Sequence, residues 1–194
     1  MDRQLLDAFE AVRDSVNASR GHYQIWYALR ARGKAIDQYF DEMNDYRFRD
    51  FFLAANIGHF KLMFVEIACL FDSGGGSHSV RNLKCLIRAN GYGGLAKNFE
   101  KQLKPFGSLV SNIKTVRSKV IAHKDIGVNE KDLYQKHGIK PDEIKVMLDT
   151  VASLMRELET VITGDASCHS VGSSDKWEIS TYKLLETLRI ARNP

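Results

Sequence analysis

A strongly basic stretch from Lys101 to Lys124 holds the residues with the clearest chemical potential in this sequence. It contains five lysines and Arg117 but no aspartate or glutamate, so its charge is +6 before histidines are counted. The whole 194-residue chain carries +4, and the remaining residues therefore sum to −2. Positive charge concentrated on one segment is typical of a site for phosphate groups. The stretch predicts a local polyanion-binding site on an otherwise balanced surface.

Arg117 and His123 are the two side chains in this stretch that could act on a bound phosphate. A guanidinium binds phosphate oxygens with a planar fork of donors, and an imidazole transfers protons near neutral pH. On an ideal helix, Arg117 lies about 80° to one side of Leu109 and His123 about 40° to the other. Their separation along the helix is about 9 Å. One helix therefore cannot bring both side chains onto one atom, whereas a symmetric partner helix would complete a composite cleft.

The same two residues also have an ordinary structural interpretation. An arginine at the edge of an apolar stripe usually extends to solvent, and a histidine there is usually hydrogen-bonded in the core. The stripe here consists of Leu109, Ile113, Val116 and Val120. The acid-free surroundings favour phosphate binding, because no carboxylate nearby in sequence would neutralise Arg117. Both interpretations stay open from the pattern alone.

The elements that must position these residues are predicted to be helices throughout. Apolar residues recur at helical spacing along almost the whole chain, and neither an alternating strand pattern nor an internal repeat is evident. The predicted fold class is all-α. Ser77 or Ser79 is a candidate helix cap, Pro141 a candidate helix start, and Arg20-Gly21 a candidate break. The expected helices cover about 2–19, 23–44, 47–71, 79–89, 95–104, 108–124, 141–162 and 176–191.

Composition predicts one main domain with an appendage. Hydrophobic content of 44% and charged content of 27% are ordinary for a globular protein. Residues 164–175 are rich in serine and glycine and indicate a flexible linker. The expected organisation is a helical domain over 1–163, the linker, and a helical segment over 176–194.

Several classes of function are disfavoured. Three scattered cysteines without a Cys-x-x-Cys pair, and no apolar block near the N-terminus, favour a reduced, cytoplasmic protein without a signal peptide. Polar residues interrupt the apolar segment Phe51 to Phe71, which predicts a buried helix and no membrane partner. Gly74-Gly75-Gly76 lacks the residues of a P-loop, and Cys168-His169 lacks further ligands. We therefore expect neither a metal nor a cofactor.

The segment Val116-Arg117-Ser118-Lys119-Val120-Ile121-Ala122-His123-Lys124-Asp125 resembles the Arg-x(4–6)-His motif of HEPN domains. It is most similar to the AbiU-type branch associated with abortive infection, whose motif helix also ends in Ala-His, a basic residue and Asp. Leu70-Phe71-Asp72 and the serine-rich loop after it are similar as well. The resemblance covers roughly residues 20–165. It implies an up-and-down helical bundle with additional N- and C-terminal helices, dimerising through the motif helix.

By this resemblance the protein would be a metal-independent endoribonuclease, a defence or toxin–antitoxin component whose partners are RNA, a second copy and possibly an antitoxin protein. Arg117 would hold the scissile phosphate, His123 would transfer protons, and the RNA 2′-hydroxyl would attack. The expected supporting residues are Lys114, Ser118, Lys119, Lys124 and Asp125. Ser118 departs from the Asn, Asp or His often found after the motif arginine. A non-catalytic RNA- or protein-interaction domain is therefore the alternative.

Overall fold

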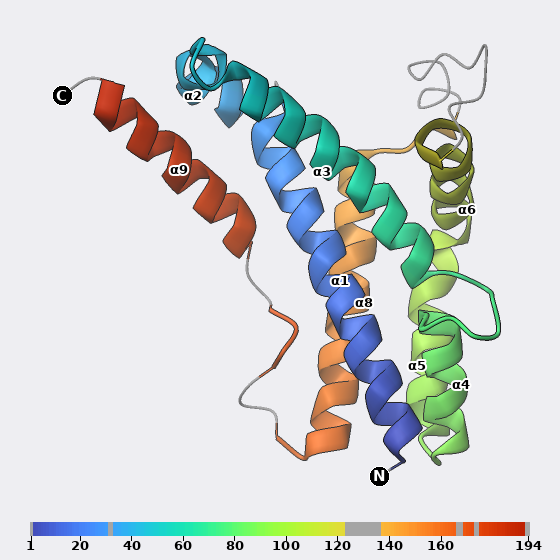
Figure 1. Ribbon diagram of the computed structural model, residues 1–194. Coiled ribbons are helices and arrows are strands. Elements are labelled where there is room, and N and C mark those ends of the chain that lie inside the picture. Colours follow the sequence, from blue (N-terminus) through green and yellow to red (C-terminus); the bar gives the residue numbers. More distant parts are fainter. Residues whose placement is uncertain (1, 31–32, 123–136, 166–168, 173–174, 193–194) are drawn as a thin grey trace. The chain divides into compact units, whose positions relative to one another are not determined.

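The computed structural model describes residues 2–30, 33–122, 137–165, 169–172 and 175–192 (Figure 1). In these residues the regular elements are helical and none is a strand, which confirms the all-α prediction. The elements are α1 (Arg3–Leu29), α2 (Lys34–Asn44), α3 (Arg49–Leu70), α4 (Val80–Ala89), α5 (Gly93–Leu103), η1 (Lys104–Phe106), α6 (Gly107–Val116), η2 (Arg117–Ala122), α8 (Pro141–Thr163) and α9 (Lys176–Arg192).

The predicted break at Arg20-Gly21 is wrong, because α1 continues without interruption to Leu29. Gly21 instead lies close to another helix, because a Cβ at this position would be only 3.2 Å from Cε2 of Trp177. A glycine inside a helix weakens it by roughly 0.5–1 kcal/mol, but it also permits a close approach of another side chain. Gly21 therefore marks a contact with the C-terminal helix.

The chain folds into two compact units that are not continuous in sequence. The first comprises residues 1–19 and 64–173, and the second comprises residues 20–63 and 174–194. Helices α1 and α3 each contribute residues to both units. The domain boundaries at 163 and 175 expected from composition stay a prediction.

The first unit has a core built from α1, α4, α5 and α8. Ser79 caps α4, with its hydroxyl oxygen 3.5 Å from the backbone nitrogen of Asn82 that donates to it, and Pro141 begins α8, as predicted. These caps satisfy or remove donors that helix ends leave unpaired. Fully buried members of the core are Leu5, Val12, Val16, Leu70, Leu83, Ile87, Phe99, Val151, Met155, Leu158 and Val171.

Part of the segment expected to be a linker is fixed to the first unit. Both carboxylate oxygens of Glu159 accept from the backbone N–H of Ser170, at 3.0 and 3.1 Å, and Asn17 Nδ2 donates to the Ser170 carbonyl. The side chain of Val171 is completely buried. Serine and glycine content did not indicate this anchor, because one apolar residue and one distant carboxylate create it.

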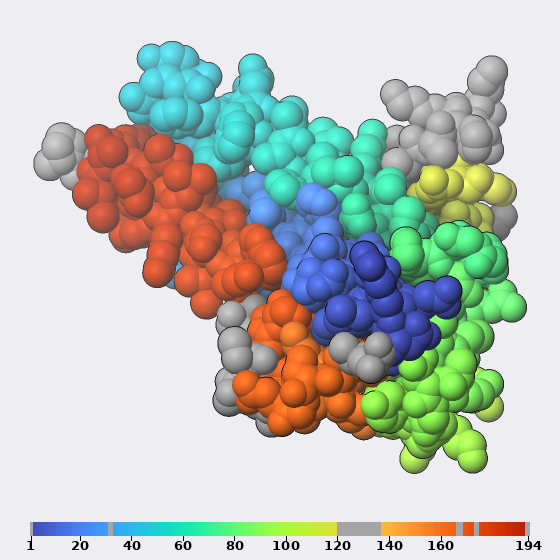
Figure 2. All heavy atoms as spheres, turned by 60° about the horizontal axis from the view of Figure 1, so that its bottom comes forward, coloured from blue at the N-terminus to red at the C-terminus, as the bar shows by residue number. Residues whose placement is uncertain are grey.

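The second unit packs α9 against α2, and Figure 2 shows their atoms in contact. Leu185 of α9 is completely buried, and Tyr39 donates its hydroxyl hydrogen to Glu186 over 3.2 Å. The side-chain oxygen of Gln24 accepts from the backbone N–H of Trp177 at 3.1 Å, which satisfies a donor at the start of α9. The C-terminal helix therefore packs on its own chain.

Helix α3 is less buried than its apolar composition predicts. Phe64, Ile67 and Leu70 are buried, but Phe51 is 61% exposed and Leu53 is 57% exposed. The expectation of a buried helix is wrong for much of its N-terminal half, where Phe52 is buried but its neighbours are exposed. By length and composition alone α3 is sufficient to cross a membrane, a test that helices of soluble proteins also pass.

Candidate nucleic-acid interface

Helix α6 and the segment η2 that continues it carry the basic residues, and the apolar side of α6 is anchored in the protein. Ile113 and Val116 are completely buried, and Leu109 is nearly so. These residues confirm three of the four positions of the predicted stripe; the side chain of Val120 lies outside the described residues. Ser111 and Ser118 are exposed. Burial of one side therefore fixes which way the helix presents its polar residues.

The helix changes its hydrogen-bond pattern at the motif arginine. Segment η2, from Arg117 to Ala122, is π-helical, with bonds spanning five residues instead of four. The backbone N–H of Arg117 itself points to the carbonyls of Ile113 and Lys114. Because a π turn holds more residues than an α turn, the angles predicted from ideal α-geometry do not hold beyond Arg117. Such turns frequently occur at functional sites.

Arg117 is half-buried and forms no ion pair with any residue that the structure describes. Other arginines differ: Arg88 lies 3.1 Å from Glu100, and Arg47 lies 2.8 Å from Asp45. A partly desolvated guanidinium without a carboxylate partner retains its donors for an external anion. Arg117 is therefore the predicted site residue whose donors the described carboxylates leave unpaired.

Lys114 has a structural contact that the sequence did not indicate. Its ammonium group donates to the carbonyl oxygen of Phe71 over 2.6 Å, and the side chain is only half exposed. This carbonyl follows the last residue of α3, where helix carbonyls lack partners and a positive charge is favourable. Backbone N–H groups of Ser73 and Gly74 lower the pKa of Asp72, and the charge of Lys114 adds to this effect. Lys114 thus joins α6 to the end of α3.

Replacing Lys114 with methionine is expected to lower the free energy of unfolding by about 1–3 kcal/mol, because the Phe71 carbonyl loses a charged donor. Lys119→Met is the matched control, since Lys119 is exposed on the same segment and makes no such bond in the part of the chain described. Chemical denaturation of both variants measures the difference. Equal stability of the two would show that the bond to Phe71 contributes nothing.

The remaining predicted residues divide between the described and the undescribed parts of the chain. Ser118 and Lys119 are exposed on η2, next to Arg117. His123, Lys124 and Asp125 lie outside the described residues. The pairing of Arg117 with His123 therefore stays a prediction.

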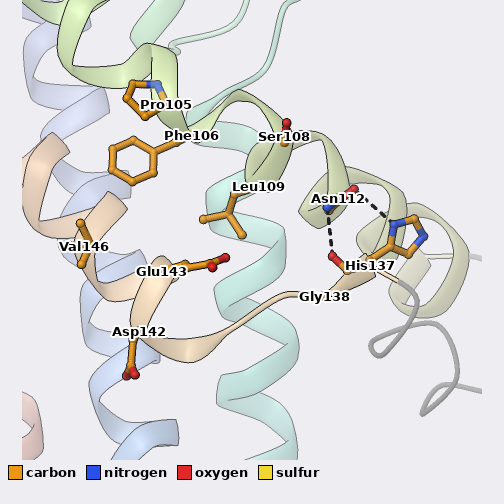
Figure 3. Close-up of a pocket in the computed structure, with 10 residues that line it drawn as sticks. All are labelled: Pro105, Phe106, Ser108, Leu109, Asn112, His137, Gly138, Asp142, Glu143 and Val146. Carbon is orange, nitrogen blue, oxygen red and sulfur yellow. Dashed lines mark hydrogen bonds between the residues drawn. The ribbon is translucent and has the colours of Figure 1, made fainter.

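A cavity of about 460 Å³ lies beside α6 and was not predicted (Figure 3). Asn112 holds one side of it: its Nδ2 donates to the His137 carbonyl at 3.0 Å, and its Oδ1 lies 3.2 Å from His137 Nδ1. Glu143 extends toward Leu109, whereas Asp142 points the other way. The cavity is lined by Pro105, Phe106, Ser108, Leu109, Asn112, His137, Gly138, Asp142, Glu143 and Val146. In the sequence, only His137 and Gly138, shortly before the helix start at Pro141, could have drawn attention to this cavity.

An all-helical fold that presents a motif arginine on a basic helix defines a domain of the HEPN class. The chain belongs to the HEPN AbiU2 family, whose model, described as AbiU2, matches residues 3–180. This confirms the resemblance seen in the motif and extends it beyond residues 20–165. The family places the protein in an abortive-infection context. Comparisons with curated proteins and with solved structures gave no match.

Proposed function

We propose that this protein is a metal-independent endoribonuclease of the HEPN type, acting in cellular defence or as the toxin of a toxin–antitoxin pair. The observation that carries the proposal is Arg117, half-buried on a helix anchored by Ile113 and Val116, with no ion-pair partner among the residues described. Membership of the AbiU2 family supports it.

In the proposed reaction, the guanidinium of Arg117 binds the non-bridging oxygens of the scissile phosphate and stabilises the charge that develops on them. His123 accepts the proton of the adjacent 2′-hydroxyl or donates one to the leaving 5′-oxygen, and two copies in a dimer can divide these roles. The 2′-oxygen bonds to phosphorus and the bond to the 5′-oxygen breaks. The products are a 2′,3′-cyclic phosphate and a 5′-hydroxyl, so DNA cannot serve as substrate. Lys119 and Lys124 would hold the flanking backbone.

We further propose that the active form is a homodimer assembled through the motif helix, because one helix presents one arginine and one histidine only. Large exposed apolar side chains on α2 and α3, including Phe40, Phe51, Leu53 and Ile57, offer further surface that association could cover. Light scattering on the purified protein should give twice the chain mass of 22.0 kDa. A strictly monomeric species that still cleaves RNA would contradict a composite site.

A cytoplasmic location fits the free, exposed thiols of Cys69 and Cys85, which persist in a reducing compartment. An antitoxin protein would be the natural partner of such a toxin. The alternative function is a non-catalytic domain that binds RNA or protein through the same basic helix. Ser118 at the position after the motif arginine favours it.

The test is incubation of purified protein with transfer RNA and total RNA in EDTA, with His123→Ala compared with wild type. We expect cleavage by wild type only, leaving cyclic-phosphate ends. His78→Ala is the matched control, because His78 is an exposed histidine on a loop and should leave cleavage unchanged. Retained RNA binding without cleavage by any variant would support the non-catalytic alternative. Equal cleavage by wild type and His123→Ala would refute the assigned chemistry.

A further inference from the structure

Two histidines face each other within the second unit. His22 of α1 and His59 of α3 are both half-buried, and their Nδ1 atoms lie 2.8 Å apart. The ring centroids are 5.1 Å apart and the planes are inclined by 44°. Both residues come from well-formed helices, so the pair is held by backbone structure on either side. The proposed RNA chemistry uses neither residue.

Both rings are expected to be neutral at neutral pH. Burial lowers the pKa of His22, and burial together with the neighbouring His22 lowers the pKa of His59. A neutral imidazole is the form that binds metal ions, because a ring nitrogen then carries a free lone pair. At this distance one ring donates its Nδ1–H to the Nδ1 lone pair of the other.

The helix faces that carry the two histidines place no charged side chain one turn from either ring. Residues one turn away lie on the same helix face as each histidine. None of them is charged: they are Ala18, Ser19, Ile25 and Trp26 around His22, and Ala55, Asn56, Leu62 and Met63 around His59. The half-buried position leaves room for water on the open side of the rings.

The separation of the two nitrogens matches adjacent ligands of one metal ion. With metal–nitrogen bonds of about 2.0–2.1 Å, a 2.8 Å separation subtends roughly 85° at the metal. Adjacent ligands in tetragonal or octahedral geometry lie near this angle, and imidazole in such geometry favours Ni²⁺ and Cu²⁺. A tetrahedral ion would require the nitrogens to move apart by about half an ångström.

We propose that His22 and His59 form a binding site for one divalent transition-metal ion of the nickel or copper type, with water completing its coordination. The ion lies beside the line that joins the two nitrogens, at bonding distance from both, and both rings turn so that their Nδ1 atoms face it. The donor ring moves its proton from Nδ1 to Nε2, so both Nδ1 lone pairs point to the metal and no proton is released. The described residues contain no group of three or more histidine, cysteine, aspartate or glutamate side chains that could hold a metal ion. The site therefore cross-links α1 and α3 within the second unit through two protein ligands only.

The test is calorimetric titration of the full chain with Ni²⁺ at pH 7.5, comparing wild type with His59→Gln and His22→Gln. Glutamine retains a polar side chain that can hydrogen-bond the remaining imidazole but is a poor metal ligand, so these variants should fold. We expect one Ni²⁺ per wild-type chain and about tenfold or greater weakening in either variant. His78→Ala, which removes an exposed histidine elsewhere, should bind as wild type does.

Thermal denaturation provides a second readout, because a ligand that binds only the folded protein raises its midpoint. Ni²⁺ should raise the midpoint of wild type and His78→Ala but not that of His59→Gln. The proposal is overturned if wild type fails to bind at millimolar Ni²⁺, or if all four proteins bind alike. The first result would mean that His22 and His59 form only a hydrogen-bonded pair. The second would mean that Ni²⁺ binds at another place on the protein. Neither bears on RNA cleavage, which is measured in EDTA.

Discussion

Replacing Arg117 with alanine is expected to reduce the rate of RNA cleavage in EDTA by about 10²–10³-fold or more, the usual effect of removing one donor to a developing oxyanion. Arg117 has no carboxylate partner among the described residues, and in the proposed reaction its guanidinium binds the substrate phosphate. Arg117→Lys retains the charge but loses the planar fork, and should give an intermediate rate. Initial rates on a single purified RNA measure both effects.

The control for this experiment is Lys119→Met, since Lys119 is exposed on the same π-helical segment. Loss of one flanking phosphate contact should lower the affinity for RNA modestly and make that affinity less dependent on salt concentration. Cleavage should persist. Circular dichroism should confirm that the helical content of each variant is unchanged. If Arg117→Ala cleaved as fast as Lys119→Met, the arginine would have no role in the reaction.

Phe99→Ala is expected to have the largest effect on stability, lowering the free energy of unfolding by about 3–5 kcal/mol. Phe99 is completely buried in the core of the first unit, and its helix leads through η1 into α6. Removing the ring leaves a cavity that neighbouring side chains cannot fill completely. Urea denaturation followed by far-ultraviolet circular dichroism measures the change.

Phe40→Ala makes the same chemical change at a side chain that is 54% exposed on α2. This substitution should lower the free energy of unfolding by no more than about 1 kcal/mol, because the exposed ring buries little apolar surface in the folded protein. Comparable losses in the two variants would mean that the ring of Phe99 is not enclosed as the structure describes.

Helical periodicity and local caps were sufficient to predict most of the helices. The buried stripe of Ile113 and Val116, the cap at Ser79 and the start at Pro141 all depend on residues within one or two turns. Interactions over this range are visible in a sequence pattern. The helical fold and the anchored side of the motif helix could therefore be predicted.

Features created by distant residues could not be predicted in this way. Helix α1 continues through Gly21, which lies against Trp177 more than 150 positions later. Glu159 accepts a hydrogen bond from Ser170 that composition does not reveal. The π turn at Arg117 altered angles calculated for an ideal α-helix. Lys114 was predicted to support RNA binding, yet its ammonium group donates to the Phe71 carbonyl. In each instance tertiary contact or backbone variation decided the outcome.

The position of Trp177 beside Gly21 also bears on the protein's intrinsic fluorescence, because it places this tryptophan in the second unit. The chain has two tryptophans, and both Trp177 and Trp26 belong to the second unit, where Trp26 packs against Phe60. Tryptophan emission therefore responds to the environment of that unit, whereas circular dichroism records the helices of both. Superimposed denaturation curves from the two signals would indicate a single cooperative transition. Curves that separate would give each unit its own stability from one sample, without any added label.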